Sequence, residues 1–128
     1  MTRPAYFLDT NGCIFLLSRA RPALTARVEA CRPGSIAISA IVGAELALGF
    51  SRAGPQGWTA FSRFLASFPM LPFDEAAARA YARVPFRRGK LDRLIAAHAL
   101  ALDVVLITAN ERDFADVPGL KIEDWTKP

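Results

Sequence analysis

Short apolar runs alternate along this chain with longer stretches of helical spacing. The runs lie at residues 6–8, 35–38, 70–72, 104–107 and 120–122, and each has the length of a short buried strand. The stretches between them predict helices over 10–18, 22–31, 40–50, 57–68, 74–84 and 92–102, with a short turn at 111–115. This alternation is typical of a parallel sheet covered by helices, so we predict an α/β fold with a parallel sheet of four to five strands flanked by helices.

Capping residues agree with several of these boundaries. Ser39 and Asp74 are suited to helix N-caps, and Pro22 is suited to a first helical turn. Gly34 and Gly49 are suited to C-terminal helix stops. These residues therefore predict where the helices between the strands begin and end.

The chain has the size and composition of one compact domain. It has 128 residues, of which 52% are hydrophobic and 22% are charged, so it can bury a core of useful size. The segment 52–57 (Arg-Ala-Gly-Pro-Gln-Gly) breaks the helical spacing and predicts a turn rather than a domain boundary. We therefore expect residues 1–128 to form a single domain.

The cysteines and the apolar runs favour a soluble protein. Cys13 and Cys31 lack the spacing of a zinc site or a redox pair, so we interpret both as small buried hydrophobic residues. The longest apolar region, 94–107, contains a histidine and an aspartate, and the apolar run near the N-terminus stops at Asp9. Neither is long enough for a membrane span or a signal peptide. We expect a cytoplasmic protein with no membrane partner.

Four acidic residues lie against segments that otherwise predict the core. Asp9 ends an apolar strand, and Glu45 interrupts an apolar helix. Asp92 opens another helix with small apolar residues on its own face, and Asp113 follows a strand. Carboxylates are rarely tolerated in such places unless they are paired or bind a metal. Because the carboxyl ends of parallel strands meet at one edge of a sheet, we predict that the four meet there.

Each acid also has an ordinary structural interpretation. Asp9 and Asp92 are candidates for helix N-caps. Glu45 is a candidate for an ion pair with an arginine, and Asp113 for a surface turn. A divalent cation accounts for all four together, because several carboxylates at close range cannot all stay ionised without one. This composition predicts a Mg²⁺ or Mn²⁺ site for phosphodiester hydrolysis, in which the metal lowers the pKa of an attacking water.

Polar residues beside these acids predict supporting contacts. Asn11 follows the first acid by two positions, and Thr108 and Asn110 come directly after the strand 104–107. A hydroxyl or an amide at such positions can orient a carboxylate or a water.

Basic residues crowd the approach to the third acid. The formal net charge is +4, and the surplus cations must lie away from an acidic pocket. We interpret one group of them as a surface that holds the backbone phosphates of a nucleic acid, with an ordinary solvated surface as the alternative. The group consists of Arg87, Arg88, Lys90 and Arg93.

Three other features have mainly structural interpretations. His98 lies six residues after Asp92, on another face of the helix, so we interpret it as structural. Trp125 is expected to pack against the edge strand, with base stacking as the alternative. The aromatic face of helix 57–68 predicts core packing, with a dimer or partner interface as the alternative.

The chain resembles the PIN-domain ribonucleases, specifically the VapC-type toxins of bacterial toxin–antitoxin pairs. The matching stretches are Leu-Asp-Thr-Asn at 8–11, 39–46 with its glutamate, Leu-Pro-Phe-Asp at 71–74, Asp-Arg-Leu-Ile-Ala-Ala-His-Ala-Leu at 92–100, Thr-x-Asn-x-x-Asp-Phe at 108–114, and 117–125. Two departures stand out. The connection 81–92 is shorter than in many relatives, and Gly12 occupies a position that is usually apolar.

The resemblance implies a PIN-domain-like parallel sheet and Mg²⁺- or Mn²⁺-dependent endoribonuclease activity. It implies that the metal-binding acids are Asp9, Glu45, Asp92 and Asp113. It also implies a homodimer and a cognate antitoxin whose tail lies over the active-site groove, so that DNA would be contacted only through the antitoxin.

We therefore predict an RNA-cutting toxin. One alternative is a non-catalytic PIN-fold module that acts through an antitoxin and DNA-binding complex. The presence of all four acids argues against this alternative, because without a metal nothing would offset the repulsion among their charges. A phosphatase or a DNA nuclease would use the same carboxylates, but the basic residues favour a polymeric substrate over a small phosphate ester.

Overall fold

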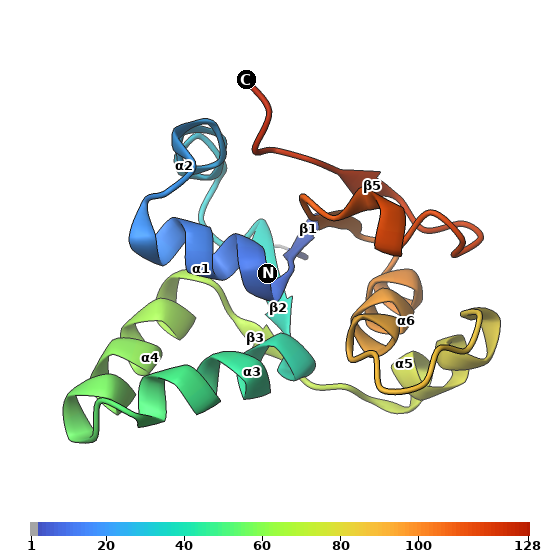
Figure 1. Cartoon of the computed structure of the whole chain (residues 1–128), viewed down its shortest axis with the longest axis horizontal. Coiled ribbons are helices and arrows are strands. Elements are labelled where there is room, and N and C mark those ends of the chain that lie inside the picture. Colours follow the sequence, from blue (N-terminus) through green and yellow to red (C-terminus); the bar gives the residue numbers. More distant parts are fainter. Residues whose placement is uncertain (1–2) are drawn as a thin grey trace.

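The computed structural model describes residues 3–128 and contains five strands in one parallel sheet (Figure 1). The strands are β1 (Tyr6–Leu8), β2 (Ile36–Ser39), β3 (Met70–Leu71), β4 (Val105–Ile107) and β5 (Ile122–Glu123). Their order is β3-β2-β1-β4-β5, and every neighbouring pair is parallel. The predicted α/β fold with a parallel sheet is confirmed.

The strand order places a ligand-binding position at the centre of the sheet. The chain begins at β1, builds outward through β2 and β3, and then returns to the other side of β1 to form β4 and β5. In open α/β sheets, ligands bind outside the carboxyl ends of the strands where the order reverses in this way. Here that position lies at the ends of β1 and β4.

Helices cover both faces of the sheet. They are α1 (Thr10–Ser18), α2 (Pro22–Glu29), α3 (Ala40–Ser51), α4 (Pro55–Ser67), α5 (Glu75–Ala80) and α6 (Asp92–Leu102), with short 3-10 helices η1 (Tyr81–Arg83) and η2 (Glu111–Asp113). Figure 1 shows α1 and α2 on one side of the strands, α5 and α6 on the other, and α3 and α4 as a hairpin. No helix within residues 3–128 combines the length and the apolar content needed to cross a bilayer.

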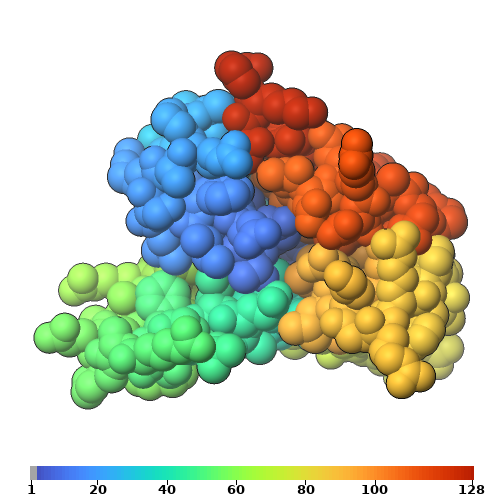
Figure 2. All heavy atoms as spheres, viewed as in Figure 1, coloured from blue at the N-terminus to red at the C-terminus, as the bar shows by residue number. Residues whose placement is uncertain are grey.

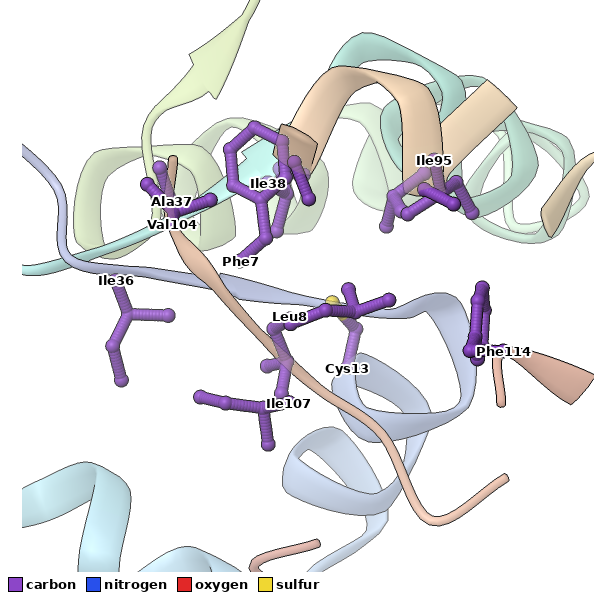
Figure 3. Close-up of a cluster of buried hydrophobic side chains, with 14 of the residues drawn as sticks. Phe7, Leu8, Cys13, Ile36, Ala37, Ile38, Ile95, Val104, Ile107 and Phe114 are labelled. Carbon is purple, nitrogen blue, oxygen red and sulfur yellow. The ribbon is translucent and has the colours of Figure 1, made fainter. Parts of the chain in front are cut away.

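Side chains of β1 enter the core on both faces. Phe7 points toward α6, where Ile95 lies, and it is fully buried (Figure 3). Leu8 points the opposite way, toward Cys13 of α1 and Ile107 of β4 (Figure 3). A strand covered on both faces needs apolar residues at successive positions, which explains why the strands read as continuous apolar runs.

Most predicted helix starts are confirmed, whereas both predicted glycine stops are wrong. Ser39 and Asp74 accept hydrogen bonds from backbone N–H groups as N-caps, and Pro22 opens α2. Gly49 lies inside α3, which continues to residue 51. Gly34 lies beyond the end of α2, in the turn before β2, with φ +86°.

The predicted helix 74–84 is shorter than expected. The α-helix ends at Ala80, and a 3-10 turn follows it. Val84 is extended because it precedes Pro85, whose ring disfavours the helical conformation in the residue before it. This ends the helical segment and begins the connection to α6.

The hairpin of α3 and α4 depends on a close backbone contact. A Cβ atom on Gly57 would lie 1.8 Å from the backbone oxygen of Phe50, so only glycine permits this approach. On the aromatic face of α4, Phe64 is buried but Trp58 is 48% exposed. The predicted core role therefore applies to only part of that face.

The structural predictions for Cys13 and Trp125 are confirmed, whereas the one for Cys31 is not. Cys13 is buried as predicted, whereas Cys31 is only partly buried. Trp125 is buried, with its ring 4.9 Å from that of Tyr6, so it packs against the sheet and is inaccessible for base stacking.

Candidate active site

Asp9 lies at the end of β1 and is held from two sides. One carboxylate oxygen, Oδ1, accepts a 2.7 Å hydrogen bond from the backbone N–H of Gly12, which makes Asp9 the N-cap of α1. The other, Oδ2, accepts a 2.6 Å hydrogen bond from the hydroxyl of Thr108 at the end of β4. Asp9 therefore caps α1 and belongs to the site at the same time, so its two interpretations do not exclude each other.

Gly12 fits closely beside this carboxylate. A Cβ atom at this position would lie 3.0 Å from Oδ1 of Asp9 and 2.6 Å from a methyl group of Leu8. Glycine in place of the usual apolar residue at position 12 therefore affects how α1 starts, because it leaves room for the Asp9 carboxylate that caps the helix.

Glu45 approaches Asp9 from α3. Its carboxylate accepts a 2.6 Å hydrogen bond from the hydroxyl of Thr10, the first residue of α1. Within residues 3–128 it takes part in no ion pair, so the alternative of a structural salt bridge to arginine does not apply. The Glu45 carboxylate is close enough to Asp9 and Asp92 to act on both electrostatically, so it belongs to the same site.

Asp92 and Asp113 reach the same edge from two further segments. Asp92 is the first residue of α6, but the N-cap position belongs to Leu91, and no side chain among the described residues caps this helix. Asp113 ends η2, and its carboxylate accepts a 2.7 Å hydrogen bond from the side-chain amide of Asn110. The N-cap interpretation of Asp92 is therefore wrong.

Hydrogen bonds connect the first acid to the last through the segment after β4. The backbone N–H of Asn110 donates to the Thr108 hydroxyl at 3.0 Å, and this hydroxyl donates to Asp9. The Asn110 amide then donates to Asp113. Residues 108–113 thus hold two carboxylates from opposite ends of the chain in one network.

The acids also affect one another electrostatically. Burial raises the pKa of Asp9, the hydrogen bonds from Thr108 and Gly12 oppose this, and the charges of Asp92 and Glu45 raise it further. Burial likewise raises the pKa of Asp92, as do the charges of Asp113 and Glu45. Lys90 and Arg93 partly offset these effects. The four carboxylates thus form one electrostatically coupled group, which we call the acid cluster.

The acid cluster has the ligand chemistry of a hard divalent cation. Carboxylate oxygens are the donors that Mg²⁺ and Mn²⁺ prefer, and a cation would offset both the burial and the mutual repulsion that raise the pKa of Asp9 and of Asp92. In the described part of the chain, no three Asp, Glu, His or Cys side chains approach closely enough to form a complete metal cage by themselves. The fit of these residues to the metal therefore lies in the chemistry of their carboxylate donors.

Arg93 differs from its predicted role. Its side chain is only 1% exposed, and its guanidinium donates to the Asp116 carboxylate at 3.1 Å. It also donates to the backbone oxygens of Pro85 and Asp113. The prediction that Arg93 grips RNA phosphates is wrong, because a buried, paired guanidinium cannot reach a polymer in solvent. Instead it joins the connection before α6 to the segment that carries Asp113.

The other basic residues of this group stay at the surface. Arg87, Arg88 and Lys90 are exposed, and Arg87 shares the Asp116 carboxylate at 3.1 Å. Arg87 and Lys90 line a small hollow with Asp92 and Asp113. Cations therefore border the acid cluster on the side of α6.

His98 has a structural role, as predicted. It is 1% exposed, its Nδ1 lies 2.8 Å from the hydroxyl of Ser39, and its ring packs edge-on against Phe7 and Phe73. Burial lowers its pKa, against the opposing charge of Asp74, so the ring is neutral near pH 7.

Sequence reasoning missed two residues at this site. Thr10 donates a hydrogen bond to Glu45. The sequence could have indicated a site role for Thr10, because it lies between Asp9 and Asn11 and is the first residue of α1. Asp116 pairs with a residue 23 positions away, and no local pattern indicates that contact.

The fold and the acid cluster define the class: an α/β protein with carboxylates gathered where its strand order reverses. The family model described as PIN domain matches residues 6–120. The chain belongs to the PIN domain family.

Its similarity to individual proteins covers nearly the whole chain. It is 30% identical to Ribonuclease VapC2 of Rickettsia felis over 95% of this chain and 98% of the relative. It is 31% identical to the tRNA(fMet)-specific endonuclease VapC of Shigella flexneri over 94% of this chain and 98% of the relative. A solved structure of DNA-bound VapBC from Salmonella typhimurium has a TM-score of 0.83 and 28% identity, over 95% of this chain and 98% of that one.

Proposed function

We propose that this protein is a VapC-type toxin, an endoribonuclease that depends on Mg²⁺ or Mn²⁺ and is restrained by a cognate antitoxin. The observation that carries the proposal is the acid cluster, in which burial raises the pKa of Asp9 and of Asp92 and the charges of the neighbouring acids raise both further. Such coupled, perturbed carboxylates in one place are typical of functional sites. The names of the relatives, ribonuclease and endonuclease, support hydrolysis of RNA.

In this proposal the acid cluster holds the metal and its neighbours hold the acids. Asp9, Glu45, Asp92 and Asp113 supply the carboxylate ligands. Thr108, Thr10 and Asn110 fix three of those carboxylates through the hydrogen bonds described above. A bound divalent cation supplies an activated water at neutral pH and stabilises negative charge on the phosphate. No serine, cysteine or histidine nucleophile is needed, which agrees with the buried, neutral state of His98.

The substrate of this site is a nucleic acid strand. Arg87, Arg88 and Lys90 are exposed beside Asp92, where they neutralise backbone phosphates and bring the strand to the acids. A small phosphate ester would not require this extended basic border.

A separate apolar groove suits the antitoxin. It has a volume of about 310 Å³ and is lined mainly by α1 and α3, with Ile14 and Leu17 about half exposed along it. In Figure 2 the blue surface of α1 adjoins the green surface of the α3–α4 hairpin. The groove reaches Thr10 and Glu45, so an apolar antitoxin segment lying in it would extend to the acid cluster.

The DNA-bound VapBC complex of Salmonella typhimurium supports a partner of this kind. We propose that DNA is contacted only through the antitoxin, and that the exposed cations beside Asp92, such as Arg87 and Lys90, serve the RNA substrate. We also expect a homodimer.

The alternative is a non-catalytic module. It is less favoured, because without a metal nothing would offset the repulsion among the four carboxylates of the acid cluster.

Cleavage assays with charge-neutral variants test this function. Purified, antitoxin-free protein is expected to cut RNA with added Mg²⁺ or Mn²⁺, and Asp9→Asn and Asp92→Asn are expected to abolish cutting. Asparagine can still cap α1 at position 9, so the fold should survive. Asp103→Asn is the matched control, because Asp103 is exposed and its one ion pair within residues 3–128 is with Lys121. Undiminished cleavage in excess EDTA would refute the metal-dependent mechanism.

A further inference from the structure

A polar hollow opens beside Asp9, separate from the apolar groove. It has a volume of about 240 Å³ and is lined by Asp9, Asn11, Phe15, Ala109 and Asn110. It shares no lining residue with the apolar groove or with the basic hollow beside Asp92. A strand that runs past the acid cluster from the basic side therefore has a second place to contact the protein.

The hollow presents unused hydrogen-bonding groups. The side chain of Asn11 is exposed and forms no hydrogen bond with any residue between 3 and 128. Asn110 is fixed by its bonds to Thr108 and Asp113, yet these use only its N–H groups, so its side-chain oxygen is left as an acceptor. Together the two amides offer donors as well as acceptors at the mouth of the hollow.

One wall of the hollow is aromatic. Phe15 is partly buried on α1, and the guanidinium of Arg21 lies 4.7 Å from the centroid of its ring. An aromatic side chain combined with amides matches a nucleobase, which has π-faces and a hydrogen-bonding edge. It matches an aliphatic side chain less well than the apolar groove does.

We propose that this hollow binds one unpaired nucleobase of the RNA, on a nucleotide adjacent to the phosphate that is cut. Asn11 reads the edge of the base, the oxygen of Asn110 provides a fixed acceptor, and Phe15 contacts the base face. The inference rests on the proposed function, because the acid cluster locates the phosphate and Asp9 belongs to both places. It makes Asn11 a determinant of base preference, in place of its predicted role of orienting a carboxylate, since its side chain donates to no carboxylate within residues 3–128.

Sequencing of cleaved ends tests the proposal. Wild type, Asn11→Leu and Gln56→Leu each digest a random-sequence RNA library with Mn²⁺, and the base frequencies around the cut are compared. Gln56→Leu is the control, because it removes an exposed amide on α4 that lines neither the polar hollow nor the apolar groove. We expect Asn11→Leu to reduce the base preference at one adjacent position by roughly five- to tenfold, the effect of one lost hydrogen bond. Gln56→Leu should leave it intact.

An unchanged preference in Asn11→Leu, or an equal loss at every position, overturns the proposal. So does weaker antitoxin binding by Asn11→Leu without a change in base preference, since the hollow would then serve the protein partner. A failure of the proposed function is distinguishable, because wild type would then cut no RNA. In that case NMR titration of wild type with the four nucleoside 5′-monophosphates decides: shifts at Asn11 and Phe15 support the hollow as a base site, and their absence overturns it.

Discussion

The hydroxyl of Thr108 donates a 2.6 Å hydrogen bond to the carboxylate of Asp9, joining the ends of the two central strands. The two residues are 99 positions apart in the chain, yet both are nearly fully buried. This bond holds the carboxylate in one orientation and partly offsets the cost of burying it. The position of Asp9 therefore depends on how β4 is placed beside β1.

Replacing Thr108 with valine tests the importance of this bond. The change keeps the shape but removes the hydroxyl that donates to Asp9 and accepts from the N–H of Asn110, so the free energy of unfolding should fall by about 1.5–3 kcal/mol, the range for a hydrogen bond to a charged group. Cleavage activity should fall about tenfold or more, because the carboxylate loses its fixed orientation. Chemical denaturation and RNA cleavage measure the two effects.

Thr25→Val is the matched control for that change. Thr25 is also buried, but its hydroxyl has no hydrogen-bond partner within the described residues. Its replacement should leave both quantities unchanged or raise the stability slightly. Equal losses in the two variants would show that the hydroxyl of Thr108 has no special role.

Arg93 should stabilise the protein more than an ordinary surface arginine does. Arg93→Gln removes a buried guanidinium with its pair to the partly exposed Asp116 and its contacts to two backbone oxygens, so we expect a loss of about 1–3 kcal/mol in the free energy of unfolding. Arg79→Gln removes an exposed pair with Glu75 and should cost less than about 0.5 kcal/mol. Similar denaturation midpoints for the two variants would contradict the role of Arg93.

Asp116 should make the protein sensitive to acid. Partial burial opposes its ionisation, but the hydrogen bond and charge of Arg93, together with Arg87, hold the pKa of Asp116 below its usual value of 3.8. A depressed pKa in the folded state adds stability above the ordinary pKa, and this stability is lost as the pH falls through the lowered value. Asp116→Asn should therefore show a weaker loss of stability below pH 3.8 than wild type, measured by urea denaturation at several pH values. An identical acid dependence in both proteins would exclude this contribution.

Two glycines of the α3–α4 hairpin should respond to alanine in opposite ways. Gly57→Ala would place a Cβ atom 1.8 Å from the backbone oxygen of Phe50, so the hairpin must open and the protein should lose at least about 2 kcal/mol of stability. Gly49→Ala meets no atom within 4 Å and lies in a helix, so it should add about 0.5–1 kcal/mol. Thermal denaturation distinguishes these outcomes, and a stabilising Gly57→Ala would show that the close contact is absent.

The sequence predicted the sheet and its helices because their signals are local. Apolar runs and helical spacing identify strands such as β1, and Ser39 and Asp74 mark helix starts by their own side chains. The expectation for Gly49 failed because an isolated glycine inside a helix has the same local signal as one at its end.

Long-range pairing is what the sequence could not supply. Arg93 stands among surface arginines in the chain, and only its contact with Asp116 shows that it is buried. The meeting of the acids at one edge followed from the general geometry of parallel sheets. The hydrogen bonds that hold them, such as the one from Thr10 to Glu45, required the packing of specific helices.

The central claim is that Asp9, Glu45, Asp92 and Asp113 together hold a divalent cation. Titration of Mn²⁺ into antitoxin-free protein, followed by electron paramagnetic resonance, measures this directly. The account predicts that wild type and Asp103→Asn bind Mn²⁺ alike, whereas Asp9→Asn and Asp92→Asn bind it at least about tenfold more weakly. Equal binding by all four proteins would contradict the claim.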